Sequence, residues 1–198
     1  MRRETAVNHP KLLTVSRPDL LEDGSDLRLR AVIHRLHSHG QIMDQLASGF
    51  GELYGVSGVQ HQMMTTIQRL QGVDGVAVVE VAEYIHRSGA FVTVETGKLV
   101  GAGLVEKGSD INDGRRVLLR LTPEGNKRLA DLAPIQRSIN DLMFSFLDRE
   151  KFQQLAELLE ELLPSTEHAA DMLKLINKDR KRTVGRPASQ HKKTKQAG

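Results

Sequence analysis

The sequence predicts a mainly α-helical protein with one small β hairpin, and two observations support this prediction. Apolar residues recur at helical spacing over most of the chain, as at Val32, Ile33 and Leu36. Two short runs alternate apolar and polar residues, at 104–107 and 116–121, and a polar, turn-rich segment joins them as in a hairpin. No apolar run approaches the roughly 20 residues that a membrane-spanning helix needs.

The N-terminal part of the chain is expected to form an arm and one long helix. The arm, residues 1–26, contains helix breakers such as Pro18 and Gly24. The helix, residues 27–56, carries apolar residues at helical spacing and ends at Gly55, a residue type common just past a helix end.

Residues 57–121 are expected to form a separate lobe. Ser57 is a cap for a helix that runs to about Leu70. There follow a short strand at 76–78, a helix at 79–86, a tight turn, a helix at about 90–102 and a hairpin at about 104–121. This order is that of a winged helix-turn-helix, in which the second helix of the pair enters the DNA major groove and the hairpin forms a wing.

Helices are expected again over residues 122–177. Thr122, Pro123 and Glu124 mark a helix start, because they supply a capping hydroxyl, a proline at the first helical position and an early acid. This helix is expected to reach about Leu147.

Two further helices are expected before the chain ends. The first ends at Pro164 and carries a dense apolar stripe of Phe152, Leu155, Leu158, Leu159, Leu162 and Leu163. Ser165 caps the second. A stripe this apolar suits a helix that packs either across a dimer interface or, alternatively, inside the core of a monomer.

The net charge of +3 hides an asymmetry between the tail and the rest of the chain. From Lys178 onward there are eight Lys and Arg residues against one acid, Asp179, which leaves −4 for the remainder. The tail, residues 178–198, suggests a polyanionic partner such as DNA and is expected to be disordered when free. Its Gly-Arg-Pro at 185–187 is similar to a degenerate AT-hook, and the alternative is a basic arm that contacts phosphates nonspecifically.

The sequence argues against several classes of function. There are no cysteines, which excludes disulfides and thiolate metal sites. The N-terminus lacks a basic segment followed by an apolar one, so no signal peptide is expected. We therefore expect a cytoplasmic location. No phosphate-binding glycine loop, HExxH motif or nucleophile motif occurs, so no enzyme is expected. His34, His37 and His39 lack a further suitable ligand nearby in the sequence, so neither a metal nor a cofactor is expected.

Residues 79–129 resemble the MarR family of bacterial winged-helix regulators. Residues 88–107, SGAFVTVETGKLVGAGLVEK, are similar to the family's recognition helix, with its Ser-rich start, its Val-Thr and its terminal Gly-Leu-Val. Residues 110–125, DINDGRRVLLRLTPEG, are similar to its wing, with an acidic loop, Asp-x-Arg, an alternating strand and Leu-Thr-x-x-Gly opening a helix. The flanking helices match in kind only.

The resemblance implies roles for three residues of the wing. Asp113 would brace the hairpin against its neighbouring arginine, and Arg115 would reach into the minor groove, where narrow A·T-rich DNA has an enhanced negative potential. Arg116 should point the opposite way on an alternating strand, where it touches phosphate or pairs with Asp110 or Asp113.

The recognition helix supplies the other expected DNA contacts. We expect Thr93, Thr96 and Lys98 to face the groove, because threonine and lysine can contact base edges or a thymine methyl group. Arg87 and Ser88, at the start of the helix, are expected near phosphates. Many relatives carry arginines in the middle of this helix, whereas here Lys98 is its one base.

Three more residues of this helix have two interpretations each. Glu95 accepts a hydrogen bond from a cytosine amino group or faces solvent. Gly97 and Gly101 either allow a close approach to DNA or simply weaken the helix, by up to about 1 kcal/mol each.

The resemblance also implies a homodimer, with residues 27–56 and 122–177 as the dimerisation helices. A twofold dimer would present two recognition helices about one turn of DNA apart, roughly 34 Å, and this predicts a palindromic operator. Relatives often bind a small aromatic effector between these helices and the DNA-binding lobe. The candidate polar groups and walls of such a site are His34, His37, His61, Met63, Met64 and Phe144, and the alternative for each is an ordinary surface or core role.

The sequence therefore predicts a dimeric, sequence-specific DNA-binding transcriptional regulator, a repressor released by a small ligand, in the bacterial cytoplasm and on the nucleoid when bound. The alternative is a winged-helix module for protein contacts with no operator of its own. Arg115 and the basic tail favour DNA, and the −4 charge of the remainder favours the alternative. Arg115→Ala and Lys98→Ala are expected to lose DNA binding under the first interpretation only.

Overall fold

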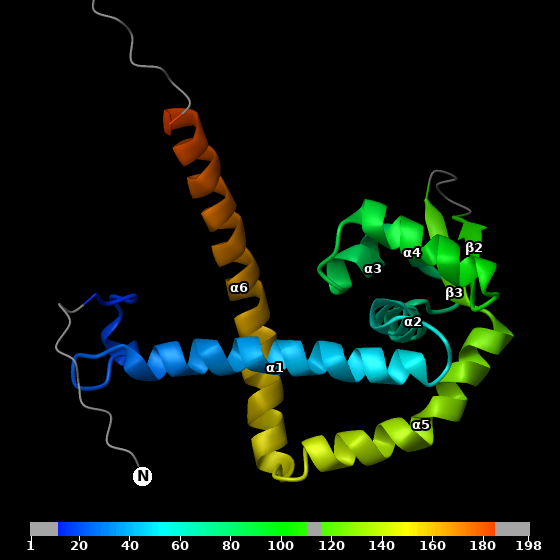
Figure 1. Cartoon of the computed structure of the whole chain (residues 1–198), viewed down its shortest axis with the longest axis horizontal. Coiled ribbons are helices and arrows are strands. Elements are labelled where there is room, and N and C mark those ends of the chain that lie inside the picture. The colour runs from blue at the N-terminus through cyan, green and yellow to red at the C-terminus, as the bar shows by residue number, and fades with distance from the viewer. Residues whose placement is uncertain (1–11, 111–115, 185–198) are drawn as a thin grey trace, which may run out of the picture. The chain divides into compact units, whose positions relative to one another are not determined.

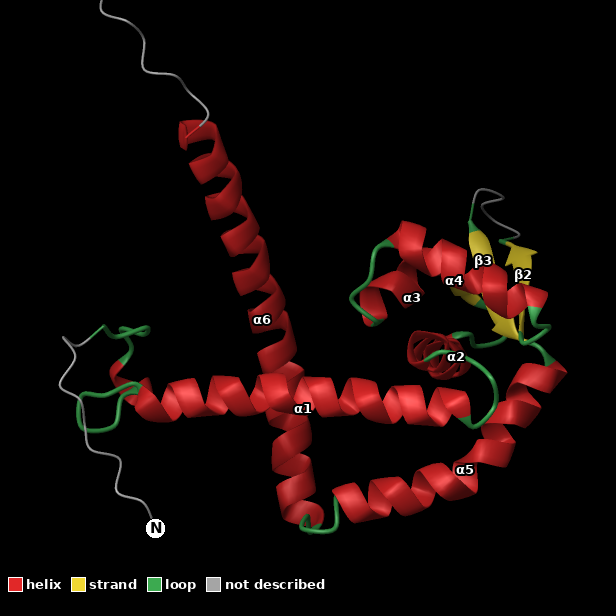
Figure 2. Cartoon of the chain, in the orientation of Figure 1, coloured by secondary structure: helices red, strands yellow, loops and turns green. Residues whose placement is uncertain are grey.

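The computed structural model describes residues 12–110 and 116–184. The chain divides into two compact units, Met1–Ile139 and Asn140–Gly198, which are described separately below. Figures 1 and 2 show a mainly helical chain with one small sheet, as the sequence predicts.

The first unit begins with a short 3-10 helix, η1 (Pro18–Leu20), and the long helix α1 (Leu27–Glu52). Helix α2 (Gly58–Leu70) follows and packs against α1. Its predicted cap, Ser57, is confirmed as one half of a capping box: the Ser57 Oγ accepts from the Gln60 amide at 3.3 Å, and the Ser57 amide donates to the Gln60 Oε1 at 3.0 Å.

The helix-turn-helix pair and the wing form the rest of the lobe. Strand β1 (Val76–Ala77) leads directly into α3 (Val78–Tyr84), and α4 (Gly89–Gly101) follows after a short turn. Strands β2 (Val105–Ser109) and β3 (Val117–Leu121) form an antiparallel hairpin, and β1 pairs with the other edge of β3, so the sheet order is β1-β3-β2. Figure 2 shows these strands beside α4, which is the arrangement that places a wing next to a recognition helix.

One hydrophobic core holds this lobe together. Its fully buried side chains come from α2, α3, α4 and the sheet: Met63, Met64, Ile67, Val81, Val92, Leu99, Val105 and Leu119. Each element contributes only a few of these side chains, so the stability of the lobe depends on the packing of all of these elements together.

Helix α5 (Pro123–Met143) begins as the sequence predicts. The Thr122 hydroxyl accepts from the Gly125 amide at 3.0 Å and donates to the Gly103 carbonyl at 2.7 Å, so the cap also holds the end of α4. A side chain at Gly125 would collide with the Leu104 carbonyl, so this helix start needs a glycine. The helix ends at Met143, earlier than the predicted Leu147.

The second unit is dominated by one helix, α6 (Arg149–Val184). Asp148 caps its start, because the Asp148 carboxylate accepts a hydrogen bond from the Lys151 amide at 2.8 Å. The predicted break at Pro164 is wrong. Proline removes the one backbone donor that would bond the Glu160 carbonyl, and the helix continues through Pro164 despite this loss. The prediction that a disordered tail starts at Lys178 is also wrong, because helix α6 continues to Val184. Residues 185–198 lie outside the described chain.

Candidate nucleic-acid interface

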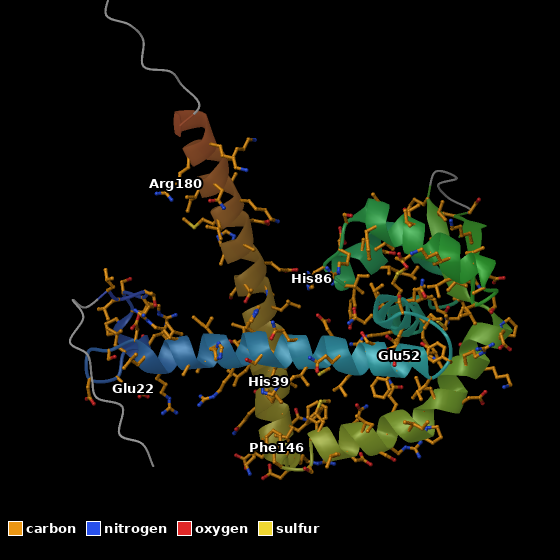
Figure 3. The ribbon with its side chains drawn as sticks, viewed as in Figure 1. Glu22, His39, Glu52, His86, Phe146 and Arg180 are labelled. Carbon is orange, nitrogen blue, oxygen red and sulfur yellow. The ribbon has the colours of Figure 1, made fainter. Side chains whose placement is uncertain are left out.

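Helix α4 is the second helix of the helix-turn-helix pair, and its inner face fixes its position. Val92 and Leu99 are buried in the core of the lobe. The Ser88 Oγ caps the helix by accepting from the Phe91 amide at 3.2 Å. The turn before it contains His86 in the left-handed region, with φ 52° (Figure 3). On the outer face, Val94 is 60% exposed and an added Cβ at Gly97 would meet open space, so this face is uncovered.

Four of the residues expected near DNA lie on the exposed side of α4 or at its start. Thr93 is exposed, and its hydroxyl donates to the Gly89 carbonyl at 2.8 Å. The Arg87 guanidinium lies 6.0 Å from the centre of the Phe91 ring, and Ser88 is the N-cap. Lys98 is also at the surface, with its side chain 59% exposed. Their roles as DNA contacts remain predictions.

Thr96 does not face the groove, so that expectation is wrong. Its side chain is fully buried, and its Oγ1 has no hydrogen-bond partner among the described residues. Val92, Thr96 and Leu99 are spaced as one stripe of a helix, and this stripe faces the core. A polar residue inside an otherwise apolar stripe is what misled the sequence interpretation.

Glu95 is neither a free solvent-facing carboxylate nor available to cytosine. It is 7% exposed and accepts from the Lys98 Nζ at 2.7 Å and from the Gln60 Nε2 at 2.9 Å. The Lys98 ammonium, helped by the Gln60 amide, holds the pKa of Glu95 below its ordinary value against the opposing effect of burial. Sequence reasoning missed Gln60, although the Ser-x-x-Gln spacing of the capping box marks it.

At the base of the wing, Arg116 pairs with acids rather than standing free. Its guanidinium lies 3.7 Å from Asp110, one of the two acidic partners expected for it, and 3.6 Å from Glu80. Glu80 also accepts from the Ala77 amide at 2.8 Å, so this cluster ties the wing to the start of α3. Asp113 and Arg115 lie outside the described residues.

A pocket of about 380 Å³ opens between α4 and the wing. Thr93 and Thr96 of α4 line it on one side, with Val78 at the start of α3. Lys107 and Arg116 supply basic groups on the side of the wing. The exposed Lys107 beside an apolar wall is the feature that suits a small anionic molecule, since Arg116 already pairs with Asp110 and Glu80 and the Thr96 hydroxyl is buried.

Five of the six residues expected to form an effector site belong to the first unit, and their environments differ. Met63 and Met64 are fully buried in the closed core, while His34 and His37 are exposed on α1. His61 is buried, where its Nδ1 lies 2.7 Å from the Tyr54 hydroxyl and desolvation lowers the pKa of its imidazole.

Phe144, the last of the six, belongs to the second unit, where it lines a separate pocket of about 490 Å³. Figure 3 labels the neighbouring Phe146 at the turn between α5 and α6. All six residues were predicted for the effector site from their positions along helices alone. Those positions carry no information on the direction in which each side chain points.

The described part of the chain also bears on metal binding and on membrane insertion. Residues 12–110 and 116–184 contain no group of three or more His, Asp or Glu side chains placed to hold a metal ion. In the same ranges, no helix is both long enough and apolar enough to pass through a bilayer.

Comparison with known proteins reveals this fold in solved structures of DNA-binding regulators. A single-site mutant of MarR from E. coli, complexed with operator DNA, has a TM-score of 0.58 at 21% identity, over 70% of this chain and 99% of that chain. The S. aureus MepR–DNA complex has a TM-score of 0.56 at 24% identity, over 68% of this chain and 96% of that one. The chain has the winged-helix fold of MarR and MepR.

A further MepR structure, a mutant from a multidrug-resistant S. aureus clinical isolate, has a TM-score of 0.53 at 24% identity and covers 69% of this chain and 96% of its own. No protein-family model and no curated protein matches the sequence. Each alignment uses nearly all of the MarR or MepR chain but only about two thirds of this one. The fold that the resemblance implied is confirmed, and the chain carries additional residues beyond it.

Proposed function

We propose that this chain is a dimeric, DNA-binding transcriptional regulator of the MarR family, and that it is a repressor released by a small ligand. The observation that carries the proposal is the presentation of α4: Val92 and Leu99 anchor its inner face in the core, while its outer face is uncovered beside the β2–β3 wing. Two solved structures with this fold, those of MarR and MepR, are complexes with DNA. This sequence contains no recognised catalytic motif, and the proposal includes no enzymatic activity.

The proposed DNA contacts follow from this geometry. The outer face of α4, with Thr93, enters the major groove, and Arg87 and Ser88 lie near phosphates at its start. Arg115 and Asp113 lie outside the described residues, and the sequence alone supports their proposed roles, a minor-groove contact for Arg115 and bracing of the hairpin by Asp113. The basic end of the chain adds phosphate contacts, and the protein acts in the bacterial cytoplasm.

A homodimer is proposed because α1 and α6 each expose apolar side chains that the helix's own unit does not cover. On α6 the apolar residues alternate spacings of three and four, as in a coiled-coil seam: Phe152, Leu155, Leu159, Leu162, Ala169, Leu173 and Ile176, with Thr166 between them. Ile33 and Leu36 of α1 are exposed as well. A second copy is the occupant, since two recognition helices are needed to read a palindromic operator.

Ligand release is supported by the pocket between α4 and the wing. A small aromatic anion in this pocket would contact Thr93 and Arg116, and both residues belong to the elements proposed to hold DNA. This pocket is proposed in place of the site expected from His34, which is exposed on α1, and His61, which is buried in α2.

The proposal is tested by fluorescence anisotropy with a duplex from the region upstream of the protein's own gene. The unmodified protein is expected to bind as a dimer, and Arg115→Ala is expected to weaken binding by about tenfold or more. Arg17→Ala, at an exposed arginine of the N-terminal arm, is the matched control and should leave affinity unchanged. Equal affinities of the unmodified protein, Arg115→Ala and Arg17→Ala for the duplex would show that the wing does not contact DNA.

The alternative function is a winged-helix module that binds another protein. It is favoured by one observation: the only cation of α4, Lys98, is paired with Glu95 rather than free. Failure to bind any duplex at low ionic strength would support this alternative, because the electrostatic part of DNA binding is strongest there.

A further inference from the structure

Lys98 is the only Lys or Arg in α4, the segment GAFVTVETGKLVG, yet it does not project freely from the helix. Its Nζ lies 2.7 Å from the Glu95 Oε1, three residues earlier on the same helix. The Lys98 side chain is 59% exposed, whereas Glu95 is 7% exposed. The ammonium is therefore turned from the surface of the helix onto a buried carboxylate.

A second contact fixes that carboxylate from the other side. The Glu95 Oε2 accepts from the Gln60 Nε2 at 2.9 Å, and the Gln60 Oε1 accepts from the Ser57 amide at 3.0 Å. Gln60 belongs to the capping box of α2, so its position is set by the start of that helix. Glu95 therefore cannot follow Lys98 outward without losing a contact to α2.

We propose that Glu95 withholds Lys98 from DNA, acting as an internal counter-ion that keeps the single cation of the recognition helix away from phosphates and bases. The inference rests on the proposed DNA-binding function. It assigns Glu95 and Gln60 as positioning residues that lower the DNA affinity of α4. The helix then reads the groove with its uncharged outer face, where the Thr93 hydroxyl is itself bonded to the Gly89 carbonyl at 2.8 Å.

The physical reason lies in the environments of the two possible acceptors for Lys98. Moving the ammonium to a phosphate would leave Glu95 ionised and buried with only the Gln60 amide as a partner, and an unpaired buried charge is strongly unfavourable. A Lys98–phosphate contact would release counter-ions from the DNA, but an unpaired phosphate stays stabilised by water and counter-ions, whereas the buried Glu95 carboxylate has no such replacement for Lys98.

The main test is Glu95→Gln, which keeps the shape of the side chain and an acceptor for Gln60 but removes the charge. Binding to a short fluorescent duplex of mixed sequence is measured at several KCl concentrations. Because Lys98 is released, the variant is expected to bind at least about threefold more tightly, with a salt slope steeper by about one. Unchanged or weaker binding by the folded variant would overturn the proposal.

A double-mutant cycle separates release of Lys98 from a general loss of negative charge. In a Lys98→Met background there is no cation to release, so Glu95→Gln is expected to leave the salt slope unchanged and to gain no more affinity than the removal of an exposed charge gives. Glu106→Gln, at an exposed carboxylate of β2, is the matched control for charge removal alone. An equal gain with and without Lys98, or an equal gain from Glu106→Gln, would show that simple repulsion explains the effect and would overturn the proposal.

Lys98→Met alone gives a test that leaves the buried carboxylate in place. The substitution is expected to change the DNA affinity by less than about twofold, whereas the sequence alone led us to expect loss of binding. A loss of affinity of about tenfold with a shallower salt slope would overturn the proposal. Circular dichroism of each variant establishes that it is folded. Failure of the unmodified protein to bind the duplex at low salt would instead refute the proposed function, and with it the reason for the inference.

Discussion

The winged-helix lobe and helix α6 use the same types of apolar residue in opposite ways. In the lobe, Met63, Met64 and Ile67 of α2 are fully buried. On α6, Leu158 is 65% exposed and Met172 is 59% exposed. The two regions differ in what surrounds each apolar side chain, since α3, α4 and the sheet close around α2, whereas α6 is a single long helix.

This difference teaches which part of the chain folds by itself. The lobe buries its apolar groups against its own elements, so its stability is internal. An isolated helix has little stability in water unless an apolar face packs against something, and α6 carries such a face over most of its length. The structure of the lobe can therefore be tested by mutations that act within one chain, and that of α6 by mutations that act between chains.

The largest expected effect is on the closed core. Ile67→Ala removes a fully buried side chain and should lower the free energy of unfolding by about 2–5 kcal/mol. The measurement is urea denaturation followed by circular dichroism at one fixed protein concentration, because a dimer's stability depends on concentration. Val73→Ala, at an exposed valine of the neighbouring loop, is the control and should change the free energy by less than about 0.5 kcal/mol. Equal effects of the two substitutions would contradict a closed lobe.

The next effect is on association through α6. Leu162→Glu places a charge in the apolar stripe and should weaken self-association by about 2–3 kcal/mol, while the lobe stays folded. Sedimentation equilibrium measures the dimer dissociation constant. Gln153→Glu adds the same charge at a position outside the stripe and should leave that constant unchanged. A Leu162→Glu protein that dimerises normally would exclude α6 from the interface.

The comparison also explains which features could be predicted from the sequence. Local signals carried the boundaries of most elements: Ser57 and Thr122 are caps, and the alternating burial of β3 marks one strand of the hairpin. These signals depend on neighbours within a few residues, so they survive without knowledge of the fold. Pro164 shows the limit of these local signals. The rule that proline ends a helix failed there, because the residues on both sides of Pro164 favour a continuous helix α6.

The candidate site was less predictable because it depends on the rotation of each helix about its axis. Thr93 and Thr96 are three residues apart on α4, yet one is exposed and the other fully buried. Glu95 was considered only as a reader of DNA or a solvent-facing residue, because its partner Gln60 is 35 residues away in the sequence. Contacts between distant segments determine such outcomes, and one sequence carries no direct signal for them.

The smallest effect concerns a third kind of anchoring, in which polar contacts rather than apolar ones hold the N-terminal arm to α1. Asp26 accepts from both the hydroxyl and the amide of Thr14 at 2.6 Å, and Arg30 lies 3.0 Å from its other oxygen. The Thr14 hydroxyl, then the Thr14 amide, lowers the pKa of Asp26 from 3.8 to about 2.

Because the folded pKa lies below the unfolded one, this anchor is at full strength above about pH 4 and is lost as the pH falls towards 2. The Thr14 amide proton, followed by NMR, should therefore titrate with a midpoint near 2. In Thr14→Val, which keeps the shape of the side chain and removes the hydroxyl, the midpoint of the amide at this position should rise towards 3.8, since the largest stabilising contact of the carboxylate is gone. A midpoint of 3.8 in the unmodified protein would mean that Asp26 does not hold the arm, and the contrast would then reduce to its two apolar regions.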